Sequence, residues 1–286
     1  MIRHLSGMAE YIRAVEFQED TWGVGFSERV PKSLMKVTQR LGGVVAGAFD
    51  GDGTMVGFVY GMTGLENGRG VHWSDILAVS PSVRDRGVGM RLKRFQREAV
   101  LALGVSRMYW TFDPLESRNA YLNLGKLGAV VREYVPDMYG VSDSPLHRGL
   151  GTDRFVVTWE LDSRRVQERL AGAGAPGANE TAHLPCAFSV LPSKDPGDLP
   201  CPDPAAADAP GENRAALEAG RAAGGLRVPI PPNIQALRDR DPAAAAAWRR
   251  ATRAVLYPAA RDGWEVRELV RDADLSYYVV VPEPGT

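Results

Sequence analysis

Two periods of apolar residues divide the first part of this chain into helices and strands. Apolar side chains that recur every three to four residues predict an amphipathic helix, whereas alternation or a short apolar run predicts a strand. On this basis we expect helices over Met8–Asp20 and Pro31–Leu41, and strands over Ile2–Leu5, Val44–Phe49 and Met55–Tyr60. The sequence DGDG between the last two strands has the composition of a hairpin turn. The chain therefore begins as a mixed α/β protein.

A strand, a glycine-containing loop and an amphipathic helix follow one another between Trp73 and Leu103. The loop reads RDRGVG and covers Arg84 to Gly89. Further along, the pattern predicts a strand over Arg107–Phe112, a helix over Glu116–Leu127, and strands near Ala129–Tyr134 and Arg154–Leu161. Residues 1–162 are therefore expected to form one compact α/β domain.

The apolar pattern is lost over residues 163–225 and returns at Leu226. Ala, Gly, Pro and Asp dominate the intervening stretch, which buries too little surface to offset the entropy of ordering it. We interpret most of it as a flexible linker, which would wrap around the outside of the domains wherever it is ordered. Beyond it we expect a strand over Leu226–Ile230, a helix from Asp241 to about Arg261, and two strands with the sequences GWEVRELV and SYYVVV. Pro229 restricts the first of these strands to an edge or a bulge.

The order strand, helix, strand, strand in residues 226–286 is also the order of residues 107–161. The sequence GWEVREL at Gly263–Leu269 is similar to GAVVREY at Gly128–Tyr134. We therefore interpret residues 226–286 as a partial second copy of the same β-α-β-β half-domain. Chance similarity over so short a stretch is the alternative.

Composition and charge narrow the function classes. The formal net charge is −1, and no basic patch interleaved with aromatic residues points to nucleic acid. No apolar run is long enough to span a bilayer, and the start of the chain lacks the apolar core of a secretory signal. The two cysteines, Cys186 and Cys201, show neither a disulfide framework nor zinc spacing. The simplest interpretation is a cytoplasmic protein that binds no membrane.

The loop RDRGVG has the construction of an anion site. Gly87 and Gly89 let the backbone approach an anion without an intervening Cβ. The unpaired N–H groups at the start of the following helix, together with its positive dipole end, would point at that anion. A charged turn without a ligand is the alternative interpretation.

The pattern R-x-x-G-x-G at Arg84, Gly87 and Gly89, with LAVSP before it and an amphipathic helix after it, resembles motif A of the GNAT acyltransferase superfamily. No Gly-Lys-Ser/Thr follows, as a P-loop would require, and the third glycine of the dinucleotide fingerprint is missing. The order of elements over residues 1–162 also resembles that family. The resemblance implies a GNAT-like mixed, mostly antiparallel central sheet flanked by helices, and acetyl-CoA or another acyl-CoA as co-substrate, without a metal.

In that family the loop binds the pyrophosphate of coenzyme A, and the preceding strand bonds the pantetheine arm where it splays away from the next strand. The resemblance therefore assigns two groups of cofactor-binding residues, which are Arg84, Asp85, Arg86, Gly87, Val88, Gly89 and Met90 for the pyrophosphate, and Leu77, Ala78 and Val79 for pantetheine. The thioester would lie between this strand and Trp110–Asp113. We expect Arg91, Lys93, Arg94 and Arg97 to occupy the solvated outer face of the helix.

The helix SRNAYLNLGKLGA resembles motif B of the family, but it departs from that motif at one position. Leu124 stands where many members carry a tyrosine that protonates the departing coenzyme A thiolate. Tyr121 lies one helical turn away and could replace it, or it could be a core aromatic. Asn119 and Asn123 are four residues apart and would share a face, which suits either pantetheine recognition or backbone capping.

An amine must be neutral to attack a thioester, so a base or a water relay must take its proton. Asp75 and His72 are the candidates, because other family members carry a carboxylate on this strand. Asp75 alternates with Leu77 and shares its face, whereas His72 lies on the other face unless a bulge intervenes. An apolar environment would raise the pKa of Asp75 towards a useful range. An ordinary polar residue near a strand start is the alternative.

The acceptor side is expected where the loop Pro136–Asp153 meets the strand that ends at Thr111 and Asp113. Long loops inside compact domains are usually functional. Tyr139, His147, Arg148 and Arg154 could clamp a substrate carboxylate there. A surface loop without specific contacts is the alternative.

Together these features indicate an acyl-CoA-dependent N-acyltransferase, with an acetyl or succinyl donor and a small amine, such as an amino acid, as acceptor. The segments WTFDPL and RNAYLNLGKLGA also resemble a bacterial GNAT subgroup with a C-terminal extension that is associated with N-acylamino-acid racemases. No Cys or Ser–His pair is positioned for a covalent intermediate, so we expect direct attack in a ternary complex. A non-catalytic module that binds acyl-CoA or a partner protein is the alternative. Open strand edges in the C-terminal half-domain would favour a homodimer.

Overall fold

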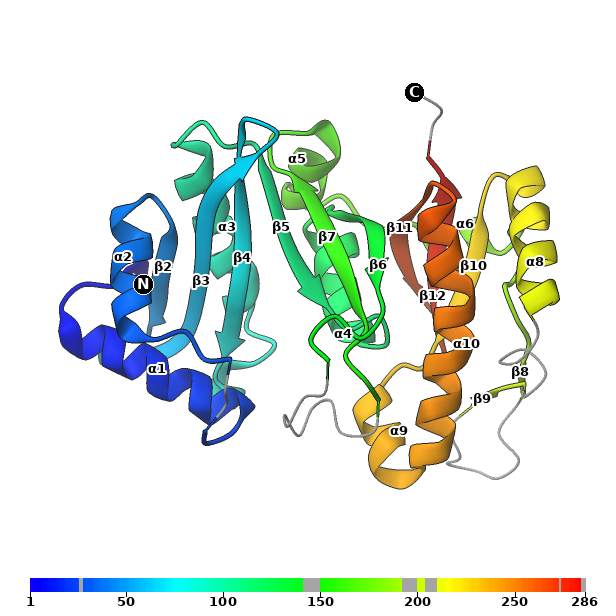
Figure 1. Ribbon diagram of the computed structural model, residues 1–286, viewed down its shortest axis with the longest axis horizontal. Helices are drawn as coiled ribbons and strands as arrows, with labels where there is room; N and C mark the ends of the chain where they lie inside the picture. Colours follow the sequence, from blue (N-terminus) through cyan, green and yellow to red (C-terminus); the bar gives the residue numbers. More distant parts are fainter. Residues whose placement is uncertain (26–27, 141–149, 192–199, 204–209, 273, 284–286) are drawn as a thin grey trace. The chain divides into compact units, whose positions relative to one another are not determined.

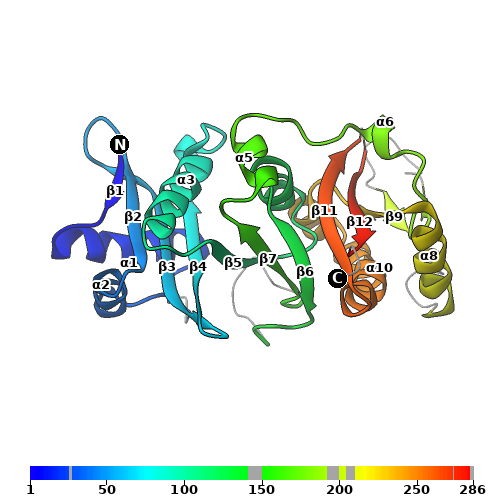
Figure 2. The ribbon, with the colours of Figure 1, turned by 90° about the horizontal axis from the view of Figure 1, so that it is seen from above.

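The computed structural model describes residues 1–25, 28–140, 150–191, 200–203, 210–272 and 274–283 (Figures 1 and 2). The chain divides into two compact units. Of the described residues, 1–110 and 159–163 belong to unit 1, and 111–140, 150–158 and those from Arg164 onward belong to unit 2. Each unit is described by itself.

Unit 1 contains a mixed sheet with the order β1-β2-β3-β4-β5, in which all neighbours are antiparallel except β4 and β5. Its elements are β1 (Ile2–His4), α1 (Met8–Trp22), α2 (Lys32–Arg40), β2 (Val44–Phe49), β3 (Met55–Glu66), β4 (Arg69–Val79), the 3₁₀ turn η1 (Pro81–Val83), α3 (Val88–Leu101) and the first part of β5 (Arg107–Phe112).

The two faces of this sheet are covered by different helices (Figures 1 and 2). Phe58 and Tyr60 of β3 belong to an apolar cluster with Tyr11 and Phe17 of α1 and Met35 of α2. Because successive residues of a strand face opposite sides, the alternate residue at position 57 faces α3. A Cβ there would come within 3.0 Å of the side chains of Val88 and Leu92, so a glycine lets α3 pack closely.

A β-bulge in β4 adds one residue to the strand, so the alternation of side chains between the two faces of the sheet changes there. Tyr60 pairs with Ile76 but the next residue of β3, Gly61, pairs with Ser74, so Asp75 is the extra residue. His72 and Ser74 therefore face α3, as do Leu77 and Val79 beyond the bulge. From the sequence, His72 was expected on the same face as Leu77 only if a bulge intervened, and the structure contains that bulge.

Unit 2 contains a sheet with the order β7-β6-β11-β12-β10. Its strands are β6 (Val130–Val135), β7 (Arg154–Glu160, whose last two residues belong to unit 1), β10 (Leu226–Ile230), β11 (Trp264–Arg271) and β12 (Ser276–Pro282), together with a separate pair, β8 (Val190–Leu191) and β9 (Cys201–Pro202). Its helices are α4 (Ser117–Ala120), the π-helix η2 (Tyr121–Lys126), α5 (Arg164–Leu170), α6 (Ala178–Thr181), α8 (Pro210–Ala223), α9 (Ile234–Arg240) and α10 (Pro242–Arg261).

The long helix α10 packs against β6, β10 and β11 (Figure 1). It begins as the sequence predicts, because the Asp241 side chain accepts a hydrogen bond of 2.9 Å from the N–H of Ala244 and Pro242 occupies the first helical position. Its buried face carries the expected side chains, which include Trp248, Val255 and Ala259.

The two halves of the unit 2 sheet share several local features. Val131 of β6 pairs with Val266 of β11, and these are equivalent positions in GAVVREY and GWEVREL. The β6–β7 register shifts at Arg132 and the β11–β12 register shifts at the equivalent Arg267. Gly128 and Gly263, which precede these strands, have φ values of 71° and 72°. Equivalent residues that meet at an antiparallel join are what a duplicated half-domain predicts.

The expected fold class is confirmed, since each unit has a sheet flanked by helices and most strand pairs are antiparallel. The stretch 163–225, which we expected to be mainly a linker, contains the helices α5 and α8 because parts of it pack on unit 2. The helix expected over Glu116–Leu127 is split into α4 and η2.

The C-terminal half-domain pairs with its own chain. β11 lies next to β6, and the main chain of Arg227 in β10 bonds Pro185 and Ala187 at 2.8 Å each. At these two edges, the argument from open strands for a homodimer loses its basis.

Candidate functional site

The loop between η1 and α3 forms a cradle of backbone N–H groups, which we define as residues 84–90. Asp85 and Gly87 have positive φ values of 65° and 73°, and Gly87 caps α3 without a side-chain hydrogen bond. The first bond of the helix runs from Arg91 N–H to Gly87 O at 3.1 Å. The N–H groups of residues 88–90 thus lack helical acceptors and project from the positive end of the helix dipole. Such a cradle suits a phosphate or pyrophosphate.

Packing within the protein does not explain the glycine at position 89. A Cβ built there would lie 3.7 Å from Val79 Cγ2 and 4.0 Å from Leu77 Cδ2, which are ordinary contact distances. Its φ is not positive, unlike that of Gly87. A glycine at this position leaves the start of α3 less covered, which suits the close approach of an anion such as the pyrophosphate that the sequence predicts.

β4 keeps one edge without a strand partner next to this cradle. β4 and β5 pair only at His72–Met108 and Trp73–Tyr109 among the described residues. From Ser74 to Val79, β4 remains paired with β3 on its other side. Leu77, Ala78 and Val79 therefore have the open main chain that the resemblance assigned to pantetheine.

Asp75, the proposed base, is the bulged residue of β4. Desolvation by the surrounding protein raises the pKa of its carboxyl group, although the residue as a whole is exposed to solvent. A hydrogen bond from Trp73 opposes this shift, and the charge of Glu28 adds to it. A carboxylate with a raised pKa is a stronger base than an ordinary aspartate and is better suited to accepting a proton.

His72, the alternative base, is fully buried. Its Nδ1 lies 3.0 Å from Thr63 Oγ1 and its Nε2 lies 3.1 Å from Gln96 Nε2. Burial, with a smaller effect from the charge of Lys93, lowers its pKa to about 3. His72 is therefore a neutral core residue, and Asp75 is the better candidate for the base.

Lys93 corrects the expected solvated face of α3, because it is only 2% exposed. Its Nζ donates to Ser74 Oγ at 2.8 Å and to Gln96 Oε1 at 3.3 Å, and it lies 3.8 Å from the ring centroid of Trp110. Burial lowers its pKa well below the ordinary value. Ser74 and Trp110 directly follow the last β4–β5 pair, so the side chain of Lys93 lies at the point where the pairing of the two strands stops.

The motif B segment has changed geometry. Because it is a π-helix from Tyr121, the spacing of four residues does not keep Asn119 and Asn123 on one face: Asn119 is exposed and Asn123 is buried. The ring of Tyr121 lies 3.9 Å from the guanidinium of Arg271 and 5.3 Å from Lys126 Nζ. Leu124 is fully buried. The family tyrosine thus has no polar replacement at this position of the helix.

Asp113, Tyr139 and Arg154, which were expected on the acceptor side, lie close together in unit 2. Arg154 Nη1 lies 3.9 Å from Asp113 Oδ2, and the Arg154 guanidinium lies 5.3 Å from the Tyr139 ring. Tyr139 Oη also lies 3.1 Å from Thr111 Oγ1. His147 and Arg148 lie outside the described residues.

Two arginines of α10, which the sequence did not single out, complete this cluster. Arg249 donates to Asp113 at 2.6 Å, and Arg253 donates to Asp153 through Nε at 2.7 Å and also through Nη2. Asp153 also accepts a hydrogen bond from Tyr134. The only sequence signal was their spacing of four residues on a helix whose other side is apolar, which does not separate an interior arginine from a solvated one.

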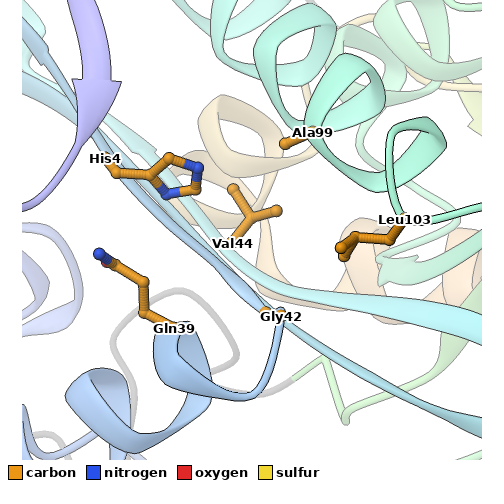
Figure 3. A pocket seen from close by; sticks show the side chains of 7 residues that line it. His4, Gln39, Gly42, Val44, Ala99 and Leu103 are labelled. Carbon is orange, nitrogen blue, oxygen red and sulfur yellow. The ribbon is translucent and has the colours of Figure 1, made fainter.

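A surface recess of about 330 Å³ in unit 1 is distinct from the cradle (Figure 3). It is lined by His4, Gln39, Gly42, Gly43, Val44, Ala99 and Leu103. Its lining is mostly apolar and includes no residue of the cradle or of β4, so we do not assign acyl-CoA to it.

The described residues lack two features, a membrane-spanning helix and a cluster of metal-ligating side chains. They contain no helix that is both long and apolar enough to cross a membrane. They also contain no group of three or more His, Cys, Asp or Glu side chains that could hold a metal ion.

No family model and no curated protein matches the chain. Among solved structures it is similar to the ribosomal-protein-S18-alanine N-acetyltransferase of Escherichia coli, at 13% identity and a TM-score of 0.45 over 57% of this chain and 94% of that one. It is also similar to an aminoglycoside 6'-N-acetyltransferase complexed with coenzyme A, at 15% identity and a TM-score of 0.42 over 57% and 98%. It is similar as well to Naa20 of Chaetomium thermophilum in complex with a bisubstrate analogue, at 14% identity and a TM-score of 0.45 over 59% of this chain and 90% of that one.

Two of these three proteins are named as N-acetyltransferases. Their TM-scores are below 0.5, so the functional argument rests on the residues of this chain. The matches also leave more than two fifths of the chain uncovered.

Proposed function

We propose that this protein is an acyl-CoA-dependent N-acyltransferase of the GNAT type that acylates a small amine. The observation that carries the proposal is the cradle at 84–90, with a glycine at 89 that the protein's own packing does not require. A pyrophosphate bound at the start of α3 would place the rest of coenzyme A next to the open edge of β4.

The cofactor site combines backbone groups from two elements of unit 1. Residues 84–90 would hold the pyrophosphate, and the main chain of Leu77, Ala78 and Val79 would bond pantetheine. Acyl-CoA, when bound, supplies an acyl group activated as a thioester. Asn119 and Asn123 remain proposals for coenzyme A contact, and of the two Asn119 is accessible to solvent.

Asp75 would accept the proton of the acceptor amine, directly or through water, because a raised pKa makes its carboxylate a stronger base than an ordinary aspartate. Tyr121 is proposed as the proton donor in place of the family tyrosine. Its phenol would give a proton to the leaving thiolate. Asp113, Tyr139 and Arg154 would contact the acceptor.

A thermal-shift titration tests cofactor binding. Acetyl-CoA and succinyl-CoA, raised to about millimolar concentration, should stabilise the protein by mass action. The variant Gly89→Ala should lose most of that shift while keeping its own thermal midpoint. Gly51→Ala is the control, because a Cβ there meets open space and the residue lies in the β2–β3 turn, away from the cradle. No shift with any coenzyme A ester would overturn the proposal.

The second candidate function is a non-catalytic module that binds acyl-CoA. The buried leucine at position 124 favours it, because the usual proton donor is absent there. Coenzyme A release with a panel of amines and amino acids separates the two functions. Stabilisation by acyl-CoA without release on any acceptor would favour the module.

The donor, the subgroup, the assembly and the location of the protein are finer proposals. Either acetyl or succinyl is the acyl group, and the racemase-associated subgroup would favour an amino-acid acceptor. Rates of coenzyme A release with each donor decide between the two. A homodimer and a cytoplasmic location also remain proposals, which sedimentation and fractionation would test.

A further inference from the structure

Arg249 of α10 is a buried arginine with an unpaired nitrogen. The residue is 5% exposed. Its Nε donates to Leu150 O at 3.0 Å and its Nη2 donates to Asp113 Oδ2 at 2.6 Å, whereas Nη1 has no hydrogen-bond partner in the described part of the protein. Buried polar groups are nearly always satisfied, and an exception usually marks a missing water, ion or ligand.

Arg249 lies in a cluster of charged side chains in unit 2. Arg154 and Arg249 both approach the one carboxylate of Asp113, at 3.9 Å and 2.6 Å. The nearby Asp153 is engaged by Arg253, by Tyr134 and by the N–H of Asp137. Asp113 is thus approached by two guanidinium groups, of which Arg249 is the closer.

Glu116 is the other acidic group near this cluster. Its side chain accepts a hydrogen bond of 2.6 Å from Gln235. Burial raises its pKa, and the charge of Asp113 adds to this, although Gln235, Arg249 and Arg154 oppose the shift. Glu116 is thus a weaker anionic partner for Arg249 than an ordinary glutamate would be.

We propose that Arg249 and Arg154 form a binding site for the carboxylate of the acceptor, so that the substrate is an amino acid or a similar amino-carboxylate. This inference rests on the proposed acyltransferase function. The guanidinium is planar and donates through a fixed fork, which matches the two oxygens of a carboxylate. Tyr139, whose ring lies against Arg154, and Thr111 would border the same site.

The proposal gives the C-terminal half-domain a direct role in function. Arg154 begins β7 of the first copy, whereas Arg249 comes from α10 of the second. A chain that ended after β7 would keep Arg154 but lack the second guanidinium. Acceptor selectivity would then depend on the C-terminal half-domain.

The test compares each acceptor with its analogue without the carboxylate. Coenzyme A release is measured for a panel of L- and D-amino acids and for the amines formed by removing their carboxyl groups. We expect kcat/KM to favour the best amino acid over its amine by about 30-fold, the effect of a charged hydrogen bond. In Arg249→Met this ratio should fall to within about threefold, with the change mainly in KM.

Arg253→Met is the matched control, because it removes a neighbouring arginine that also bonds a buried carboxylate. It should leave the selectivity ratio unchanged even if it lowers stability. Arg249→Lys should keep part of the ratio, because a charge remains without the fork. Both acceptors of a pair are measured on the same preparation, so loss of folded protein cancels from the ratio.

The outcomes separate this inference from the proposed function. Equal rates with amines and amino acids, or a ratio that Arg249→Met leaves unchanged, would overturn the carboxylate site and leave the acyltransferase standing. The unpaired nitrogen would then be satisfied by a buried water alone. No coenzyme A release with any acceptor would overturn the acyltransferase itself, and the carboxylate site with it.

Discussion

The hairpins β6–β7 and β11–β12 of unit 2 are built alike but carry different chemistry. Both follow a glycine with a φ near +70°, both have a bulge at an arginine, and they meet at equivalent valines. The registers make Phe155 equivalent to Tyr278, and these rings are in contact with centroids 5.3 Å apart. Two pairs of equivalent residues therefore meet at this join.

The differences between the hairpins lie outside the pairing. The strands of the first are separated by residues 136–153, whereas only residues 272–275 separate those of the second. In the same alignment Asp153 corresponds to Ser276. The first copy is preceded by the short α4 and the π-helix η2, and the second by α10 with 20 residues. Arg253 of α10 thus bonds a carboxylate, Asp153, whose equivalent in the second hairpin is a serine.

The largest effect is expected when the first copy is made like the second at Asp153. Asp153→Ser leaves Arg253 and Tyr134 without their buried partner and should cost about 3–5 kcal/mol of stability, as for a broken buried ion pair. Urea unfolding measures the loss. The change Ser276→Ala at the equivalent position of the second hairpin removes only a hydroxyl that bonds Ser117 and should cost about 1 kcal/mol. Equal costs would contradict the assigned role of Asp153.

The two glycines before the hairpins should differ next. Gly263→Ala places a Cβ in open space but at a φ of 72°, and should cost about 1–2 kcal/mol. At Gly128 the Cβ would also come within 2.9 Å of Arg169 Cγ and 3.2 Å of the backbone oxygen of Arg165, so the cost should rise to about 2–4 kcal/mol. Urea midpoints in that order would support this difference in packing, and the opposite order would contradict it.

The pH dependence of stability should also distinguish the copies. Burial opposes ionisation of Asp153, but the hydrogen bonds from Arg253 and Tyr134 outweigh it, so its pKa lies below the ordinary value of 3.8. The folded state therefore holds fewer protons than the unfolded state, and this stabilisation is complete above about pH 4 and lost as the pH falls below it. Denaturation midpoints between about pH 5 and 2 should show a smaller loss in Asp153→Ser than in the native protein.

The smallest effect is expected at the bulge arginines. Arg132 and Arg267 both bond Glu265, which is 2% exposed, while their own side chains are about 40% exposed. Either arginine alone should be replaceable by alanine at a cost of about 0–1 kcal/mol, because the other remains. The double variant should cost more than the sum, since it leaves Glu265 buried without these partners. Additive costs in a double-mutant cycle would show that the two arginines act independently.

The elements that local patterns determine were predictable from the sequence. Turn chemistry and apolar period located β2, β5, β10 and α10 to within a residue, and the glycines located the cradle. The bulge at Asp75 and the π-helix at Tyr121 were not predictable, because both depend on how a segment packs against its neighbours.

The buried cations Lys93 and Arg249 could not be identified from local sequence patterns. Lys93 has the spacing of an outer-face residue, yet α3 turns it inward toward Ser74 and Trp110. A glycine at position 61 makes this cluster fit, since a Cβ there would come within 2.3 Å of His72 Nε2. Arg249 likewise has no local signal, because its partner Asp113 is more than a hundred residues away. Only tertiary contacts identify such residues.

The join between β6 and β11 also affects how the protein responds to dilution. Two separate chains would fill that strand edge only in proportion to their concentration, whereas here both strands belong to one molecule. Their encounter has an effective concentration set by the chain between them, about millimolar for a flexible connection. The β6 edge is therefore covered by its own chain even when few copies of the protein are present.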